Sequence, residues 1–334
     1  AYDAVGELLH CGPHEVAIVD SATRAWAAAF AAFRFKPGDR ILVSRAEYAS
    51  NVLPILQVAE RDGVALEVVP DDESGQLDIE ALAAMLDERV ALVAVTLVPT
   101  QGGLVNPAAD IGRLTRAAGV PFLLDACQAA GQLPLDVCEL GCDVLSATGR
   151  KFLRGPRGTG FLYVREELLD RLVPPVLDLY GATWTAPARY EVRPDARRFE
   201  YFERSMAIQL GLAAAIDYAL SWGIDAIEAR LVAMAEELRR RLQELPGVDV
   251  HDQGRRRCAI VTFTVAGVPA QQVAERLRLD GVNVAVSSAS SARFDLPARG
   301  LDTLVRASVH YYNSEEEVDC LVDLVSAIAR RAAP

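Results

Sequence analysis

The sequence is poor in lysine. Its 34 basic residues include only two lysines, Lys36 and Lys151, and arginine supplies the others. Arginine cannot replace lysine where an amine must lose its proton and attack a carbonyl, because the guanidinium stays protonated. Lys36 lies in a polar turn, whereas Lys151 follows an apolar, strand-like run that ends in small residues. We therefore predict that Lys151 forms a Schiff base with a carbonyl ligand, the alternative being an ordinary loop cation.

Histidine and paired cysteines are also scarce. The four histidines are scattered and the six cysteines form no C-x-x-C pair, so we expect neither a metal centre nor a disulfide framework. The net charge of −12 argues against nucleic acid and anionic membranes as partners. No apolar run reaches the roughly 18–20 residues of a membrane span, and no signal peptide opens the chain. These absences predict a cytoplasmic protein with reduced thiols.

Short apolar runs alternate with helical patterns in the first half of the chain. Strands are expected at residues 16–20, 41–44, 66–69, 90–97, 121–125 and 161–164. Strands that alternate with helices at this spacing predict an α/β fold, with a mostly parallel sheet covered by helices on both faces. Because 334 residues exceed the usual ~100–200 of one domain, we expect a large domain, 1–212, and a smaller α/β domain, 213–334. Residues 173–205 show no regular pattern.

Several polar residues follow expected strands. Ligands of parallel sheets bind at the carboxyl ends of the strands, so Ser21, Thr100, Asp125 and Lys151 are predicted to lie in one site. Ser21 also precedes a helical pattern, and the N–H groups of a helix N-terminus can bind a phosphate. A plain helix cap is the alternative for Ser21 and for Asp125.

The motifs are spread over nearly the whole chain. They are Glu47-Tyr48 with Asn51, Asp125 with Gln128, Thr148-Gly-Arg-Lys151, Gly155-Pro-Arg-Gly158, Arg198-Phe-Glu200, Val305-Arg-Ala-Ser308 and Tyr312-Asn313. Together they resemble pyridoxal-phosphate enzymes of fold type I, and more narrowly the class V aminotransferase and cysteine desulfurase family. The resemblance implies pyridoxal 5′-phosphate as cofactor and an amino acid as substrate. It also implies a homodimer whose site lies at the interface, with residues 180–204 contributed by the partner.

The resemblance implies a role for each motif residue. Lys151 would hold the cofactor as a Schiff base and move the substrate α-proton, and Asp125 would pair with the pyridine nitrogen. Arg306 would bind the substrate carboxylate through its planar guanidinium, with Thr100 also at the substrate. The other residues that would bind the cofactor are Ala22, Thr23, Tyr48, Gln128, Thr148, Arg150 and Arg204.

Three positions depart from the family pattern. Ala49 replaces a histidine that stacks on the ring, Glu203 replaces a threonine that reaches the partner's phosphate, and residues 287–293 lack the sulfur-accepting cysteine. The missing cysteine favours a C–S lyase that acts by β-elimination on a cysteine conjugate or cysteine sulfoxide. An aminotransferase, an epimerase and a scaffold that has lost catalysis are the open alternatives. His310, about 13 Å along the strand from Arg306, is expected to be structural.

Overall fold

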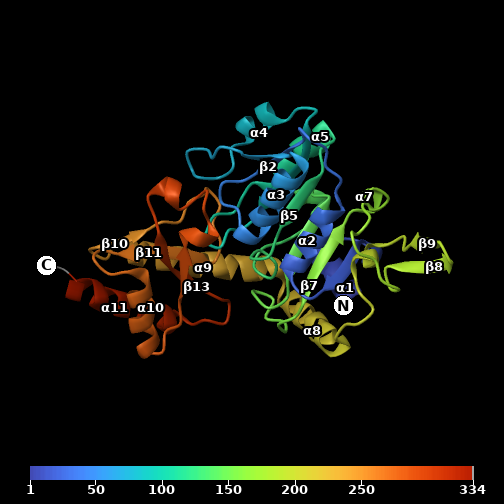
Figure 1. Cartoon of the computed structure of the whole chain (residues 1–334). Helices are drawn as coiled ribbons and strands as arrows, with labels where there is room; N and C mark the ends of the chain where they lie inside the picture. The colour runs from blue at the N-terminus through green and yellow to red at the C-terminus, as the bar shows by residue number, and fades with distance from the viewer. Residues whose placement is uncertain (333–334) are drawn as a thin grey trace.

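A seven-stranded sheet forms the centre of the computed structural model, which describes residues 1–332 (Figure 1). The strand order is β1-β7-β6-β5-β4-β2-β3. Strand β7 runs antiparallel to its neighbours β1 and β6, and the other neighbouring strands are parallel. The predicted mostly parallel sheet is therefore confirmed. The strands are β1 Val16–Val19, β2 Arg40–Val43, β3 Ala65–Val68, β4 Val90–Thr96, β5 Phe122–Asp125, β6 Val144–Thr148 and β7 Gly160–Val164.

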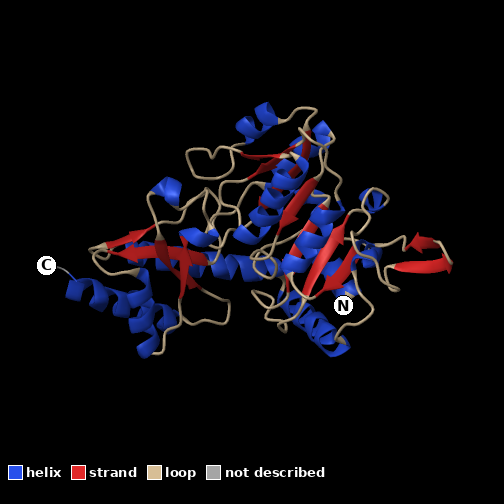
Figure 2. Ribbon diagram, viewed as in Figure 1, coloured by secondary structure: helices blue, strands red, loops and turns tan. Residues whose placement is uncertain are grey.

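Helices cover both faces of this sheet (Figure 2). Successive strand residues enter opposite cores: Phe122 and Leu124 belong to one apolar cluster and Leu123 to the other. Trp26 and Phe30 of α2 stack on each other and fill the second cluster. The helices around the sheet are α1 Tyr2–Leu9, η1 Pro13–Glu15, α2 Ala22–Ala32, α3 Ala49–Asp62, α4 Ile79–Met85, α5 Ala108–Ala118, α6 Val137–Leu140 and α7 Glu166–Leu169.

The C-terminal part forms a smaller, antiparallel sheet in the order β10-β11-β13-β12. Its strands are β10 Val248–Val250, β11 Ile260–Val265, β12 Ala285–Ser288 and β13 Thr303–Ser308. Strand β12 begins only at Ala285, because the N–H groups of Gly281 and Val282 bond back to the end of helix α10, Ala270–Leu279. The helices of this part are α9 Ile224–Gln243, α10 Ala270–Leu279, η3 Ala289–Ser291, η4 Pro297–Arg299 and α11 Glu315–Ala332.

Helix α8, Met206–Trp222, leads into α9 through a 77° bend at Gly223. Helix α8 packs on α1 of the large sheet, whereas α9 packs on β10, β11 and α11. No single helix among residues 1–332 has the length and apolar composition to cross a bilayer, although the bent pair α8 and α9 reaches that composition when taken together.

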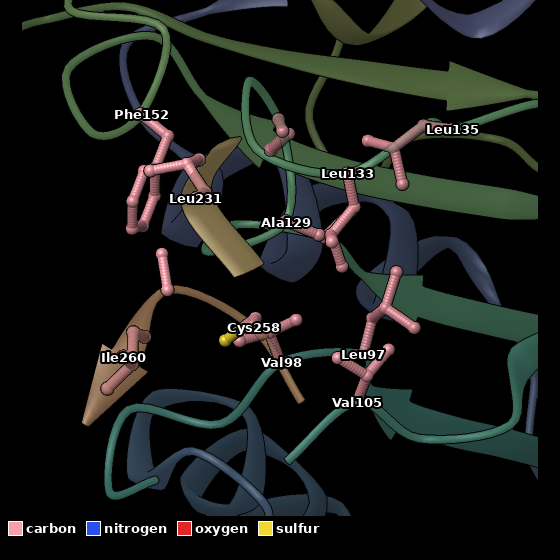
Figure 3. Close-up of a cluster of buried hydrophobic side chains, with 14 of the residues drawn as sticks. Leu97, Val98, Val105, Ala129, Leu133, Leu135, Phe152, Leu231, Cys258 and Ile260 are labelled. Atoms are coloured by element: carbon pink, nitrogen blue, oxygen red, sulfur yellow. The ribbon is translucent and has the colours of Figure 1, made fainter. Parts of the chain in front are cut away.

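An apolar cluster fills the space between the two sheets (Figure 3). Leu97 and Val105 come from the large-sheet side, Leu231 from α9, and Cys258 and Ile260 from the small sheet. All five side chains are at most 4% exposed. The two parts therefore share one continuous core.

A hairpin interrupts the stretch that the sequence pattern left irregular. Strands β8, Ala182–Ala186, and β9, Arg189–Val192, pair antiparallel, and Figure 1 shows them projecting from the edge of the molecule. Trp184 and Tyr190 lie opposite each other and are 78% and 63% exposed. Farther along, the 3₁₀ helix η2, Ala196–Phe199, returns the chain to the core.

Candidate active site

Asp125 ends strand β5 and is almost fully buried, at 4% exposure. Its strand neighbours in register are Thr96 on β4 and Ser146 on β6, so three polar side chains interrupt the apolar face at the strand ends. The Asp125 Oδ1 atom accepts from the Cys127 amide at 2.8 Å, and Oδ2 accepts from Asn51 Nδ2 at 2.8 Å. Burial raises the pKa of Asp125, while Asn51, the Cys127 amide and the Lys151 charge oppose the rise.

A second buried carboxylate, Glu47, lies behind Asn51. Its oxygens accept from the hydroxyls of Ser44 at 2.8 Å and Thr96 at 2.7 Å, and from the Thr96 amide. Asn51 Nδ2 lies 3.4 Å from Glu47 Oε2, so the Asn51 amide connects the two acids. Burial raises the pKa of Glu47 to about 7, and the nearby Asp125 charge adds to the rise. The motif had marked Glu47 and Asn51 but gave neither a role.

Lys151 lies half-buried, three residues after the end of β6 at Thr148. Its charge opposes the rise in pKa at both Asp125 and Cys127, so the amine lies near both groups. Burial, followed by the Asp125 charge, raises the pKa of Cys127 to about 11. Lys36, the other lysine, is exposed. The structure thus brings Lys151 and Asp125 together at the strand ends.

The N-terminus of helix α2 meets the start of β7, which pairs with the end of β6. Ser21 caps the helix by accepting from the Arg24 amide at 3.2 Å, and the first helical amides, of Ala22 and Thr23, need acceptors from outside the helix. The chain approaches β7 so closely that a Cβ at Gly160 would lie 2.8 Å from the Ala22 nitrogen. A helix N-terminus of this kind suits a phosphate.

The neighbouring strand β6 supplies two hydroxyls to this region. The Thr148 hydroxyl donates to the Thr159 carbonyl at 3.1 Å. The Ser146 hydroxyl is buried and has no hydrogen-bond partner among residues 1–332. Arg150, which follows the strand, is exposed. Ser146 was missed by sequence reasoning, and its spacing of two residues from Thr148, which places both on one strand face, is the signal that could have found it.

Arg306 reaches this edge of the large sheet from β13 of the small one. Its Nη1 atom donates to the Thr100 carbonyl at 3.0 Å, and the Ser287 hydroxyl donates to the same carbonyl at 3.0 Å. Arg306 Nε is buried and has no partner within residues 1–332. Burial lowers the pKa of Arg306, and the nearby Tyr48 opposes this. Nη1 of Arg306 is therefore bound to the protein, whereas the buried Nε has no acceptor within residues 1–332.

Gln128 and Arg204 have contacts within their own chain. The Gln128 carbonyl accepts from Gln132 Nε2 at 2.6 Å, and Gln132 Oε1 accepts from the Ala259 amide at 3.1 Å, which ties the Asp125 loop to the small domain. Arg204 lies 3.1 Å from Glu200, and its guanidinium is 3.9 Å from the ring centre of Tyr180. Among residues 1–332, no ion pair or hydrogen bond joins Arg204 to Lys151 within a single chain.

His310 packs as a core residue. Its ring stacks on Phe152 and Tyr312, with centroids 5.5 and 4.4 Å away, and Nε2 lies 3.1 Å from the Phe152 carbonyl oxygen. Burial lowers its pKa to about 4, so the imidazole is neutral near pH 7. These contacts agree with the expected structural role.

The family follows from comparison with known proteins. A model of the family described as aminotransferase class-V matches residues 1–321. The chain belongs to the class V aminotransferase family. It is 34% identical over 322 residues to a probable cysteine desulfurase of Xylella fastidiosa, covering 95% of this chain and 76% of that relative. A cysteine desulfurase of Dickeya dadantii is 34% identical over 302 residues, covering 86% of this chain and 69% of the relative.

Solved structures have the same architecture as this class V enzyme. The apo cysteine desulfurase of Thermococcus onnurineus NA1 has a TM-score of 0.93 at 27% identity, covering 99% of this chain and 83% of that one. A cystine C–S lyase solved with its product cysteine persulfide shares the fold, with a TM-score of 0.86 at 24% identity over 97% of this chain and 84% of that one. The predicted fold type I architecture is confirmed.

The enzyme depends on pyridoxal 5′-phosphate, and its residues fit that group. The buried Asp125 carboxylate faces the site without an ion pair among residues 1–332, which suits a protonated ring nitrogen. The unpartnered Ser146 hydroxyl and the amides at the α2 N-terminus would supply donors for polar groups of the cofactor. The amine of Lys151 lies near the same carboxylate.

Proposed function

We propose that this pyridoxal-phosphate enzyme is a C–S lyase that acts by β-elimination on a cysteine conjugate or cysteine sulfoxide. The observation that carries the proposal is the composition of residues 287–293, Ser-Ser-Ala-Ser-Ser-Ala-Arg, which include no thiol to accept sulfur. The segment is also well packed: Ser287 bonds to the Thr100 carbonyl, and Ala289 and Ala292 are buried with Leu296. Sulfur would then leave with its own substituent.

Cys127, which lies near Lys151, does not replace the missing acceptor. Burial raises the pKa of its thiol to about 11, so little thiolate is present near neutral pH. Since the thiolate is the nucleophilic form of cysteine, transfer of sulfur to Cys127 is disfavoured. This supports release of the sulfur fragment over its capture by the protein.

The residues can divide the chemistry among themselves. When bound, pyridoxal phosphate supplies an electron sink for the substrate Cα. Asp125, oriented by Asn51, holds a negative charge for the ring nitrogen, and Arg306 holds the substrate carboxylate through its guanidinium. Lys151 removes the Cα proton as general base. The Cα–H and Cβ–S bonds break, a Cα–Cβ double bond forms, and sulfur leaves with the bonding pair. Hydrolysis of the remaining fragment gives pyruvate and ammonia.

Product analysis tests the proposal. The cofactor-loaded enzyme is incubated with S-substituted cysteines, and we expect pyruvate, ammonia and the sulfur fragment in equal amounts. In parallel it is given an amino donor and a keto acid. A new amino acid in the second mixture, with no pyruvate in the first, would establish an aminotransferase and contradict the lyase.

Substitution of Lys151 tests its role, and substitution of Lys36, the other lysine in the sequence, is the control. We expect Lys151→Ala to lower turnover by about 10³-fold or more, because it removes both the covalent anchor and the general base. Lys36→Ala should keep full activity, since Lys36 is exposed in a polar turn. Borohydride reduction followed by peptide mapping should place the pyridoxyl group on residue 151. A colourless protein without such an adduct would show a scaffold that has lost catalysis.

We also propose that the enzyme is a homodimer in which residues 180–204 contribute to the partner's site. Its support is the exposure of large apolar side chains there and on the adjoining helix: Trp184 is 78% exposed, Phe202 62% and Trp222 60%. Large exposed apolar side chains of this kind are typical of protein interfaces. Sedimentation equilibrium at micromolar concentration should give twice the chain mass. A fully active monomer would contradict the proposal.

A further inference from the structure

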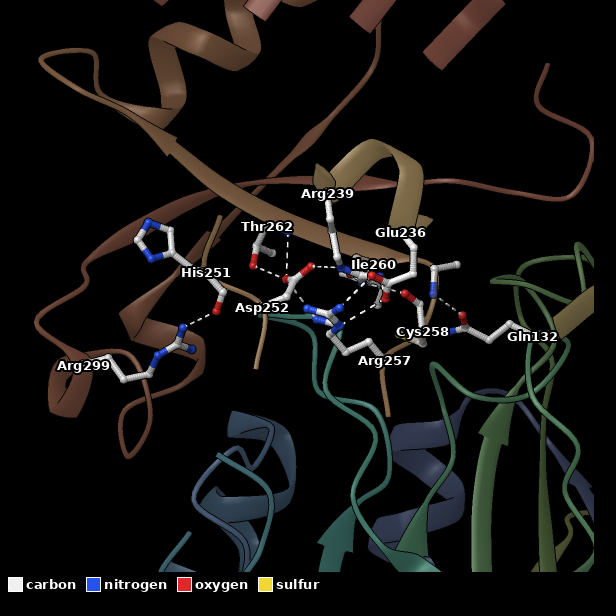
Figure 4. A network of polar contacts seen from close by, with 12 residues as sticks. Gln132, Glu236, Arg239, His251, Asp252, Arg257, Cys258, Ile260, Thr262 and Arg299 are labelled. Atoms are coloured by element: carbon white, nitrogen blue, oxygen red, sulfur yellow. Dashed lines mark hydrogen bonds and ion pairs between the residues drawn. The ribbon is translucent and has the colours of Figure 1, made fainter. Parts of the chain in front are cut away.

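A buried ion pair joins helix α9 to the segment that follows β10 (Figure 4). Arg239 Nε lies 2.7 Å from Asp252 Oδ2, and the two side chains are 2% and 0% exposed. Burying two opposite charges costs free energy of desolvation, which their attraction offsets only when further hydrogen bonds complete the geometry. This pair has such bonds, and they lead toward the active site.

The bonds connect the two parts of the molecule. Asp252 Oδ1 accepts from Thr262 Oγ1 at 2.6 Å, from the Thr262 amide at 3.0 Å and from the Gly103 amide at 3.1 Å. Arg239 Nη2 donates to the carbonyls of Cys258 at 2.7 Å and Ile260 at 2.6 Å. Strand β11 and a loop of the large domain are therefore held by one carboxylate.

Gly103 fits this contact because it has no side chain. A Cβ at residue 103 would lie 2.3 Å from Arg239 Nη2 and 2.6 Å from the Ile260 carbonyl oxygen, closer than a real Cβ can approach. The Gly103 carbonyl accepts from the Cys258 amide at 2.7 Å. Both peptide groups of the glycine are thus fixed against the small domain.

The two segments held by Asp252 meet at Arg306. Thr262 of β11 is the register partner of Arg306 on β13. On the other side, Thr100 precedes Gly103 by three residues, and its carbonyl accepts from Arg306 Nη1 at 3.0 Å. A change at Asp252 therefore acts on β11, which pairs with the strand that carries Arg306, and on the loop whose Thr100 carbonyl orients Arg306.

We propose that Arg239 and Asp252 are positioning residues that orient Arg306 for the substrate carboxylate, an inference that rests on the proposed role of Arg306. With the pair intact, Nη1 stays on the Thr100 carbonyl, and Nε, which has no partner within residues 1–332, remains for the substrate carboxylate. Without it, the guanidinium can turn, and the paired geometry that a carboxylate requires is lost. The effect is confined to ligands that carry a carboxylate.

The test compares two ligands that differ by that group. Thr262→Val and Arg239→Lys variants of the cofactor-loaded enzyme are titrated with L-alanine, which has no leaving group on Cβ, and with ethylamine. The absorbance of the bound cofactor reports binding. We expect the dissociation constant for alanine to rise about tenfold, the effect of weakening one hydrogen bond to a charged group, while that for ethylamine stays unchanged. Arg240→Lys, on the exposed side of α9, is the matched control and should change neither constant.

Arg306→Gln separates the failure of this inference from failure of the proposed function. If Arg306→Gln weakens alanine selectively while Thr262→Val and Arg239→Lys do not, the positioning role is wrong and the role of Arg306 stands. If Arg306→Gln leaves the preference for alanine over ethylamine unchanged, both are wrong. Circular dichroism checks each fold. Thr262→Val keeps the ion pair, so unchanged alanine binding in this variant contradicts the inference even if Arg239→Lys does not fold.

Discussion

Asp125 and Asp252 are both buried carboxylates, one in each part of the molecule, but the protein compensates them differently. Asp252 pairs with Arg239 at 2.7 Å and accepts three further hydrogen bonds. Asp125 accepts one side-chain amide and one backbone amide, and no cation within residues 1–332 lies at ion-pair distance. Burial therefore raises the pKa of Asp125.

The difference separates a structural acid from a functional one. A buried charge whose partners are complete fixes the protein around it, as Asp252 fixes Gly103 and Thr262. A buried carboxylate that lacks a cation is destabilised until a ligand supplies one, and such perturbed groups cluster at functional sites. The protonated ring nitrogen of pyridoxal phosphate can be that cation for Asp125.

Replacing each of the two acids by its amide should give the largest effects that test this contrast. Asp125→Asn should lower kcat by about 10²–10³-fold, the effect of removing one preorganised electrostatic partner, without lowering stability. Asp252→Asn should instead lower the free energy of unfolding by about 3–5 kcal/mol, because Arg239 is left buried without its counter-charge. Urea denaturation and steady-state kinetics measure the two effects.

The contrast fails if both variants behave alike. A loss of several kcal/mol in Asp125→Asn would mean that its two hydrogen bonds matter more for folding than its missing cation. An unchanged stability in Asp252→Asn would mean that Arg239 finds a substitute acceptor, for which Glu236, 3.0 Å from Arg239 Nη1, is the candidate.

Glu47 sharpens the comparison as a third buried carboxylate, with a smaller expected effect. Burial raises its folded pKa from 4.5 to about 7. The stability that this proton contributes is therefore fully present below pH 4.5 and is lost as the pH rises through 7. The free energy of unfolding should fall by about 3 kcal/mol between these two pH values because of Glu47. Glu47→Gln should remove that part of the pH dependence, as urea denaturation between pH 5 and 8.5 will measure.

A parallel pH profile in Glu47→Gln and the unmodified enzyme would contradict the raised pKa. Arg61, an exposed side chain that pairs with Asp62 at 2.6 Å, provides a control: Arg61→Lys keeps the charge and should leave the profile as it is.

His310 gives the smallest expected effect and tests whether burial alone marks function. Its pKa is lowered to about 4, yet its ring is fully engaged in stacking with Phe152 and Tyr312. We expect His310→Asn to lower the free energy of unfolding by about 1–2 kcal/mol through lost packing, with kcat essentially unchanged. A large fall in kcat together with unchanged stability would assign His310 to the chemistry instead.

Much of the fold could be predicted from the sequence because its strands are short apolar runs separated by clear helices. The large sheet and its strand ends follow from that alternation, so Asp125 and Lys151 were expected to be neighbours although 26 residues separate them. The β8–β9 hairpin was not predicted, because none of its strand residues is buried and it shows no apolar alternation. Residue roles in the site stay predictions.

The bonds that hold the site could not be read from the sequence. Asn51 donates to Asp125 across 74 residues, and Gln132 connects to Ala259 across 127. Such contacts depend on the relative orientation of loops that follow different strands. Neither residue spacing nor hydrophobic periodicity predicts that orientation. Arg239 and Asp252 were hidden for another reason: a surface helix rich in arginine predicts solvated charges, yet one of these arginines is 1% exposed.

The close fit of Gly103 against Arg239 has an evolutionary consequence. A methyl group at residue 103 cannot coexist with the guanidinium, which in turn needs the Asp252 carboxylate. A homologue with a shorter side chain at position 239 needs neither glycine at position 103 nor aspartate at position 252. A homologue that keeps the arginine must keep both of these residues. Among homologous sequences, these three positions should therefore covary, and the trio would identify a subgroup within the family.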